Sequence, residues 1–274
     1  MDTPVTLTPE QRYLDLLKKC LTRRLFDENF DRIPRNTKTA WRALRWGAYE
    51  AVNRVLAPWK LALVHSGRAT GESMLDLERL DNIEYCIVEA LRNGVPGDVI
   101  ETGVWRGGAT IFMKAVLDAY GATDRTVWVA DSFEGLPKPN PGKYPADAGD
   151  VFWKQSLDVS VEQVQANFRR YALLDARVKF LVGFFSDTMP VAPIDKLAVL
   201  RLDGDMYEST YVVLEHLYPK VSPGGYVIVD DYGCVPACAQ ATEDYRKTHS
   251  ISAPVRKIDW TGVFWQKPRA SPGR

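Results

Sequence analysis

Short apolar runs alternate with stretches of helical spacing along most of the chain after residue 98, and this pattern restricts the fold more than any other feature. Strands separated by helices predict a parallel sheet with helices packed on both faces. A polar loop with prolines at 137, 139, 141 and 145 follows the second strand. We expect strands at 98–104, 126–131, 178–185, 197–203 and 224–230, and helices at 108–120, 160–173, 207–218 and 234–247.

The end of the chain departs from this alternation. Two short apolar runs, 255–260 and 262–266, are separated only by Thr261. Because parallel neighbours need a long crossover connection, these two strands must pair antiparallel or belong to different sheets. The sequence therefore predicts an α/β sheet that ends in a hairpin.

The first 75 residues differ in composition and are expected to form an N-terminal helical lobe and lid. Residues 11–60 contain 12 Lys or Arg against five Asp or Glu, together with several Trp and Tyr residues. Such a stretch can contact nucleic acid or lipid, but the whole chain has 35 basic and 35 acidic residues and so no overall field that selects either. We expect the lobe to cover the main domain, to contact a second copy in a homo-oligomer, or to line the substrate pocket.

The sequence shows no membrane span, no signal-peptide pattern and no cysteine framework. No apolar run reaches the roughly 18 residues of a membrane span, and the first ten residues have neither region of a signal peptide. The four cysteines are too scattered for a disulfide scaffold, and Cys234 and Cys238 lack a second Cys or His pair that would complete a metal site. We expect free thiols on one helical face, a cytoplasmic protein, and no membrane or nucleic-acid partner.

The turn after the first expected strand indicates a cofactor of nucleoside type without phosphates. It reads Glu101-Thr-Gly-Val-Trp-Arg-Gly-Gly108, in which Gly103 permits close backbone approach. A pyrophosphate needs bare backbone at a helix N-terminus, and Trp105 stands where a second glycine would be. Asp131 ends the second strand, where a carboxylate can hydrogen-bond ribose hydroxyls. A purely structural strand–helix turn is the alternative interpretation.

Three carboxylates follow the fourth and fifth expected strands. Asp203 ends the fourth strand, and Asp230 and Asp231 end the fifth. Consecutive parallel strands are often neighbours, so these side chains should converge at one edge of the sheet. Carboxylates at that spacing repel one another unless a cation lies among them, and oxygen ligands suit Mg²⁺, Mn²⁺ or Ca²⁺. Capping of the following helices is the alternative; Asp205 and Glu208 lie further into the loop and are expected outside the direct ligand set.

Taken together, these motifs resemble the fold of S-adenosylmethionine-dependent methyltransferases and, more narrowly, the macrocin/TylF-type sugar O-methyltransferases of antibiotic biosynthesis. The resemblance implies a Rossmann-like class I methyltransferase fold, with a seven-stranded sheet whose last strand is antiparallel, over residues 76–274. It spans roughly residues 10–267. The motifs that carry it are Tyr13-Leu-Asp-Leu-Leu17, Glu72-Ser-Met-Leu75, Glu101 to Gly108, Asp131-Ser-Phe-Glu-Gly-Leu-Pro137, Leu202-Asp-Gly-Asp-Met-Tyr-Glu-Ser-Thr210 and Pro223-Gly-Gly-Tyr-Val-Ile-Val-Asp-Asp-Tyr232.

The same resemblance implies roles for individual residues. Asp203, Asp230 and Asp231 would hold Mg²⁺ or Mn²⁺, with Asp203 also the general base. Among the histidines, His65 is the one whose location suits the substrate pocket. The implied S-adenosylmethionine site comprises Glu101, Thr102, Gly103, Val104, Trp105 and Gly107 around the methionine part, Asp131 and Ser132 at the ribose, Met74 in a covering loop, and Gly183, Phe184, Ser186 and Asp187 near the adenine.

The function expected from these features is metal-dependent transfer of a methyl group from S-adenosylmethionine to a hydroxyl of a deoxysugar on a small-molecule glycosylated acceptor. A phenol or catechol acceptor would use the same metal chemistry. A dinucleotide-dependent oxidoreductase is disfavoured by Trp105 and by the terminal hairpin. A non-catalytic scaffold that retains the fold is the third alternative.

Overall fold

The computed structural model describes residues 7–25, 71–154 and 157–269. His65 and the Arg- and Trp-rich stretch 32–66 therefore lie outside the described residues. Of the expected N-terminal lobe, the described part contains helix α1 (Pro9–Leu21) and the segment 71–75. In the described part of the chain, no helix combines the length and the apolar character that crossing a bilayer requires.

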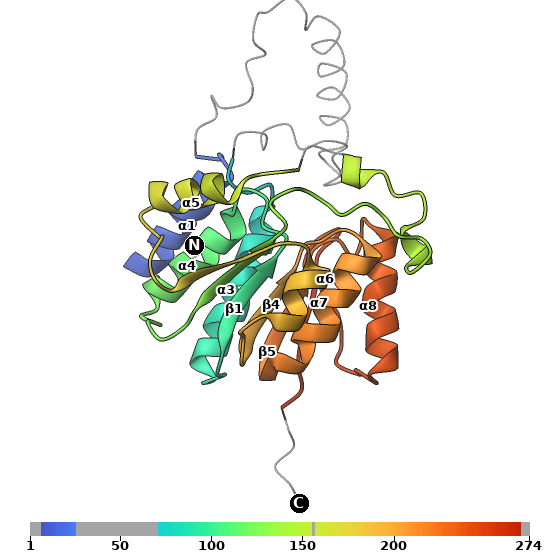
Figure 1. Ribbon diagram of the computed structural model, residues 1–274. Coiled ribbons are helices and arrows are strands. Elements are labelled where there is room, and N and C mark those ends of the chain that lie inside the picture. Colours follow the sequence, from blue (N-terminus) through green and yellow to red (C-terminus); the bar gives the residue numbers. More distant parts are fainter. Residues whose placement is uncertain (1–6, 26–70, 155–156, 270–274) are drawn as a thin grey trace, which may run out of the picture.

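Seven strands form one sheet in the order β3-β2-β1-β4-β5-β7-β6 (Figure 1). Neighbours from β3 to β5 are parallel, whereas β7 is antiparallel to both β5 and β6. The predicted terminal hairpin is thus confirmed, with β7 inserted between β5 and β6. The strands are β1 (Asp98–Thr102), β2 (Val127–Asp131), β3 (Val178–Val182), β4 (Leu197–Leu202), β5 (Val221–Val229), β6 (Arg256–Lys257) and β7 (Val263–Gln266).

Helices cover both faces of the sheet, as the alternation predicts (Figure 1). One layer contains α1, α3 (Leu77–Arg92), α4 (Gly108–Ala119) and α5 (Val161–Arg170). The other contains α6 (Phe185–Thr188), α7 (Tyr207–Leu217) and α8 (Pro236–Thr248). Short 3₁₀ helices occur at η4 (Pro145–Asp147), η5 (Phe152–Lys154), η6 (Met189–Val191) and η7 (Tyr218–Lys220).

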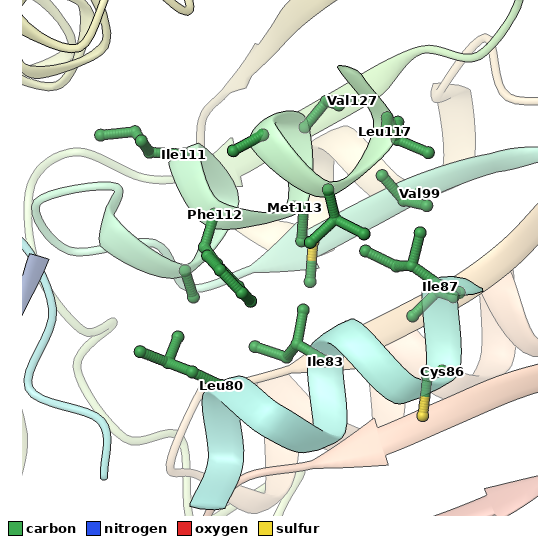
Figure 2. Packing of buried hydrophobic residues seen from close by; sticks show 14 of the residues in the cluster. Leu80, Ile83, Cys86, Ile87, Val99, Ile111, Phe112, Met113, Leu117 and Val127 are labelled. Carbon is green, nitrogen blue, oxygen red and sulfur yellow. The ribbon is translucent and has the colours of Figure 1, made fainter. Parts of the chain in front are cut away.

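Alternation of side chains along the strands builds two separate cores. Val99 and Val127 point into the core under α3 and α4, whereas their neighbours Ile100 and Trp128 point into the core under α7 and α8. Figure 2 shows the first core, where Ile83 and Ile87 of α3 face α4 and the sheet. Burial on both faces explains why the strands read as continuous apolar runs rather than as alternating ones.

Several predicted boundaries shift for identifiable reasons. The third strand ends at Val182 rather than at 185, because Gly183 has a φ of 136° and α6 begins two residues later. The run 255–260 contributes only Arg256 and Lys257 to the sheet. Cys238 lies in α8, but Cys234 precedes that helix, so the two free thiols do not share one helical face.

Candidate active site

A pocket of about 650 Å³, including the space that opens to solvent, lies at the carboxyl ends of the central strands. Ligands of open α/β sheets bind at this edge. Its walls come from the segments that follow β1, β2, β3 and β4, from the start of α7 and from the segment that carries Met74. The lining residues are Met74, Gly103, Trp105, Asp131, Ser132, Gly135, Leu136, Pro137, Leu157, Phe184, Phe185, Asp203, Gly204, Asp205 and Ser209.

Gly103 brings the end of β1 against the end of β4. Its φ is 90°, and a Cβ at this position would lie 1.8 Å from the carbonyl oxygen of Asp203. No L side chain fits at that distance, so glycine is required here for close approach as well as for its backbone conformation. The turn after β1 and the acidic loop after β4 therefore form one continuous wall of the pocket.

Asp131 is fixed by the backbone around it. One carboxylate oxygen accepts the N–H groups of Val104 at 2.7 Å and Trp105 at 3.3 Å, and the other accepts the N–H of Phe133 at 2.9 Å. Burial raises the pKa of this carboxyl, and the backbone hydrogen bonds oppose the rise. Trp105 and Phe133 have φ values of 49° and 59°, a conformation that costs free energy for residues of this kind. Backbone strain of this kind is typical of ligand-binding turns, and here it occurs in the turns after β1 and β2.

The loop that carries Met74 is held by hydrogen bonds to the start of α4 and to residues just after α1 and α5. Its Glu72 carbonyl accepts the N–H of Gly108 at the start of α4, at 2.9 Å. The buried Glu72 carboxylate accepts hydrogen bonds from Arg23 at 2.6 Å and from the Tyr171 hydroxyl at 2.7 Å. Met74 itself is 42% exposed and lines the pocket. The loop thus holds a flexible apolar side chain over one end of the pocket.

The three acids predicted to converge do lie together. One carboxylate oxygen from each of Asp203, Asp230 and Asp231 falls within 4.8 Å of the other two. Asp230 and Asp231 are buried, whereas the Asp203 side chain is 28% exposed and faces the pocket. Asp203 is therefore the member of this cluster that a ligand in the pocket can reach.

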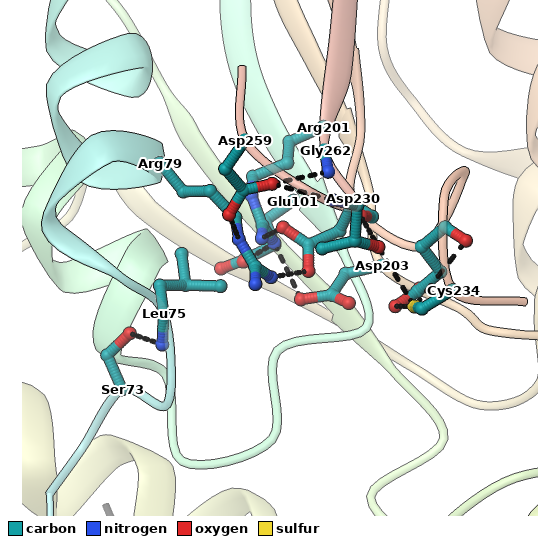
Figure 3. Close-up of polar contacts among 12 residues, drawn as sticks. Ser73, Leu75, Arg79, Glu101, Arg201, Asp203, Asp230, Cys234, Asp259 and Gly262 are labelled. Carbon is teal, nitrogen blue, oxygen red and sulfur yellow. Dashed lines mark hydrogen bonds and ion pairs between the residues drawn. The ribbon is translucent and has the colours of Figure 1, made fainter. Parts of the chain in front are cut away.

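Two arginines within the protein already supply positive charge to this cluster (Figure 3). Arg201, fully buried on β4, pairs with Glu101, with Asp203 at 2.8 Å and with Asp230. Arg79 of α3 pairs with the second oxygen of Asp230 at 2.5 Å and with Asp259 at 2.7 Å. Guanidinium groups thus contact both oxygens of Asp230, so part of the positive charge expected among the acids comes from the protein itself.

Asp231 and Asp205 remain without such compensation in the described chain. The interactions found for Asp231 are hydrogen bonds from the Asp205 N–H at 3.2 Å and the Cys234 thiol at 3.8 Å. Burial, reinforced by neighbouring carboxylates, raises the pKa of Asp231 and raises that of Asp205 to about 7. Buried like charges of this kind fit a hard divalent cation bound by oxygen ligands. The cluster of Asp203, Asp230 and Asp231 offers one oxygen from each residue to such an ion.

Some of the site residues predicted from the sequence line the pocket, and others do not. Glu101 does not line the pocket: it accepts hydrogen bonds from Thr110 and Arg201, and burial raises its pKa to about 7. Among the predicted site residues that the structure describes, those that line the pocket are Met74, Gly103, Trp105, Asp131, Ser132, Phe184 and Asp203. The predicted site residues that do not line it are Glu101, Thr102, Val104, Gly107, Gly183, Ser186, Asp187, Asp230 and Asp231.

Sequence reasoning missed several lining residues. Asp205, which is expected outside the direct ligand set, has a φ of 57° and lines the pocket. Phe185 lies between the predicted adenine residues Phe184 and Ser186, and Leu136 belongs to the motif that begins at Asp131, so the quoted motifs already contained both. Gly135, Pro137, Leu157, Gly204 and Ser209 complete the missed set.

A seven-stranded sheet in this order, with β7 alone antiparallel, together with a pocket at the ends of β1, β2 and β4, defines the class I S-adenosylmethionine-dependent methyltransferase fold. The solved structure of the O-methyltransferase NovP superposes on this chain with a TM-score of 0.80 and 43% sequence identity, covering 95% of this chain and 100% of that one. The family model of macrocin-O-methyltransferase (TylF) matches residues 10–267. The chain therefore belongs to the TylF macrocin-O-methyltransferase family.

Two relatives are similar to this chain over most of their length. The 8-demethyl-8-(2,3-dimethoxy-α-L-rhamnosyl)-tetracenomycin-C 4′-O-methyltransferase of Streptomyces olivaceus is 48% identical over 261 residues, which is 94% of each chain. The mycinamicin III 3″-O-methyltransferase of Micromonospora griseorubida is 50% identical over 217 residues, covering 75% of this chain and 85% of the relative.

Proposed function

We propose that this protein transfers a methyl group from S-adenosylmethionine to a hydroxyl on the sugar of a small glycosylated natural product, in the cytoplasm. The observation that carries the proposal is that Asp131 and Asp203 line the same pocket, where Gly103 brings the turn after β1 against the loop after β4. A donor and an acceptor bound side by side could there react without diffusing. The names of the two relatives, both O-methyltransferases of glycosylated compounds, support the acceptor class.

The donor would bind in the half of the pocket formed by the turns after β1 and β2. Asp131 is held with its carboxylate toward the pocket by three backbone N–H groups, which is the arrangement expected of a group that binds a ribose diol. Met74 would cover the donor and Trp105 would flank it, since both line the pocket. These side chains would exclude water from the sulfonium.

The acceptor would bind against the loop after β4. When bound, a divalent cation would lower the pKa of the acceptor hydroxyl and orient its oxygen. Asp203 and Asp231, with Asp230 beside them, would hold that cation. Asp203 would accept the proton as the oxygen attacks. Asp205 is a second candidate for the base, because it lines the pocket and its pKa is raised by burial to about 7.

Replacing Asp131 by Asn is expected to weaken S-adenosylhomocysteine binding about tenfold, since one hydrogen-bond acceptor and the negative charge are both lost. Titration calorimetry measures the change. The exposed neighbour Glu134 provides a matched control, because Glu134→Gln removes a charge from the same loop at a residue that does not line the pocket. Equal affinity of Asp131→Asn and wild type would remove Asp131 from the donor site.

Removal of divalent cations by EDTA is expected to abolish methyl transfer, and added Mg²⁺ or Mn²⁺ to restore it, because an alcohol is a poor nucleophile near neutral pH without activation. Added Mg²⁺ should also raise the melting temperature, since it neutralises buried acids only in the folded state. The Asp231→Asn variant should show a smaller rise. Full turnover in EDTA contradicts the proposed metal role.

The choice among acceptors and reaction classes needs a direct assay. Labelled S-adenosylmethionine tested with glycosylated, phenolic and catechol acceptors distinguishes the sugar reaction from its closest alternative. Parallel titrations with S-adenosylhomocysteine and NAD(H) distinguish methyl transfer from hydride transfer. Saturable binding of NAD(H) alone would reject the proposed function.

A further inference from the structure

Helix α7, which follows Asp203 in the chain, is capped by a side chain from a loop about 60 residues earlier in the sequence. Helix α7 begins at Tyr207 after the apolar Met206, whose side chain makes no cap. The backbone N–H groups of Tyr207 and Glu208 donate instead to the two carboxylate oxygens of Asp147, at 2.7 and 3.0 Å. Asp147 precedes Tyr207 by 60 residues and is 1% exposed.

Further interactions support the contact between Asp147 and the first turn of α7. Asp147 ends the 3₁₀ helix η4, in which its own N–H donates to the Tyr144 carbonyl at 3.1 Å, so the local backbone is fixed. The Tyr144 ring also packs against the Tyr207 ring, with centroids 6.0 Å apart. A carboxylate at a helix N-terminus satisfies N–H groups that have no helical partner and interacts favourably with the helix dipole.

Asp147 joins two segments that both line the pocket. It belongs to the proline loop, which we define as residues 136–151, and Leu136 and Pro137 of this loop are pocket residues. At the other end of the contact, Asp205 and Ser209 line the pocket just before and within the first turn of α7. The Asp147 contact therefore ties together two segments that each contribute residues to the wall of the pocket.

The hydrogen bonds that fix Asp131 on the donor side of the pocket are separate from this contact. The hydrogen bonds that hold Asp131 come from Val104, Trp105 and Phe133, and none involves the proline loop. The Met74 loop is attached through α4 and Glu72. A loss of the Asp147 contact should thus change one half of the pocket and leave the other in place.

We propose that Asp147 is a positioning residue, which fixes the acceptor side of the pocket by tying the proline loop to the first turn of α7. It contacts no reacting atom and acts through the backbone of Tyr207 and Glu208. The proposal rests on the methyl-transfer function proposed above, because acceptor affinity is one of its readouts. Its other readout, accessibility of the proline loop, is independent of that function.

The experiment compares Asp147→Ala and Asp147→Asn with the wild-type enzyme, using three measurements. These are the KM for the acceptor identified in the panel, the affinity for S-adenosylhomocysteine, and the rate of trypsin cleavage after the exposed Lys143. Loss of a helix-capping carboxylate is expected to raise the acceptor KM about fivefold or more and to accelerate cleavage after Lys143. Affinity for S-adenosylhomocysteine should stay within about twofold, since that half of the pocket is held separately.

Asp150→Asn is the matched control, because it removes a negative charge from the same loop at a residue that does not cap α7. It should keep the wild-type affinity for S-adenosylhomocysteine, and its changes in acceptor KM and in cleavage rate should be smaller than those of the Asp147 variants. Unchanged acceptor KM and unchanged cleavage in both Asp147 variants would overturn the proposal, as would equal weakening of donor and acceptor. If Asp147→Ala does not fold, Asp147→Asn, which keeps one acceptor oxygen, decides. Absence of methyl transfer by the wild type would refute the proposed function, while the cleavage rates would still test the contact.

Discussion

The Asp203→Ala enzyme is expected to lose methyl transfer by a factor of about 100 or more, with S-adenosylhomocysteine binding close to that of the wild type. General-base catalysis alone contributes an effect of that order, and the same substitution removes a proposed metal ligand. Donor binding should persist because Asp131 is held by the turns after β1 and β2. Single-turnover kinetics with labelled donor measure the first quantity, and calorimetry measures the second.

Two further variants make the result specific to Asp203. Asp203→Asn keeps an oxygen that can accept the Arg201 hydrogen bond but cannot take up a proton, and it should be as inactive as the alanine variant. Asp195→Asn changes an exposed acid just before the amino end of β4, the same strand that Asp203 follows, and should be fully active. Activity retained in Asp203→Asn but lost in Asp205→Asn would transfer the proposed role of base to Asp205.

Local pattern was enough to predict the scaffold and the edge at which the pocket lies. Strands buried on both faces leave continuous apolar runs, and the absence of a crossover around Thr261 predicted the antiparallel β7. The convergence of Asp203 with Asp230 and Asp231 followed from the rule that parallel strands end at one edge. Each of these predictions depends on residues close in sequence or on neighbouring strands.

Contacts between distant segments were beyond local pattern. Arg201 lies within an apolar run, and nothing near it in sequence indicates that its partners include Glu101, 100 residues away. Asp147 is one acid in a polar loop, and its role at α7 depends on how that loop crosses the sheet edge. Asp205 lines the pocket from a loop with a positive φ, and its residue type alone does not indicate that backbone conformation.

The buried Arg201 also explains how three acids can be tolerated beside the pocket. Arg201 pairs with Glu101, Asp203 and Asp230, and Arg79 pairs with Asp230 as well. Removing one partner of a buried ion pair is costly because the others remain buried and uncompensated. The network therefore connects the end of β1 with the ends of β4 and β5, and its stability should depend strongly on its central cation.

Arg201→Met is expected to reduce the free energy of unfolding by about 3–5 kcal/mol, because methionine fills much of the space but leaves three carboxylates without their shared guanidinium. Urea denaturation followed by circular dichroism measures the loss. Arg24→Met is the matched control: Arg24 pairs with Asp76 at 2.6 Å, but its side chain is 42% exposed. An exposed pair of this kind contributes roughly 0–1 kcal/mol, so the control should lose little.

The pH dependence of the loss identifies its electrostatic origin. Burial raises the pKa of Glu101 from 4.5 to about 7, and the Arg201 charge opposes that rise. A raised pKa in the folded state means that the associated stability is fully present below pH 4.5 and is lost as the pH rises through the folded-state value. Without Arg201 the folded-state pKa of Glu101 moves higher still. Protonation of Glu101 therefore stabilises the folded variant more than it stabilises the folded wild type. The difference in unfolding free energy should therefore be smaller at about pH 6 than at about pH 8, and a pH-independent difference would assign the loss to packing instead.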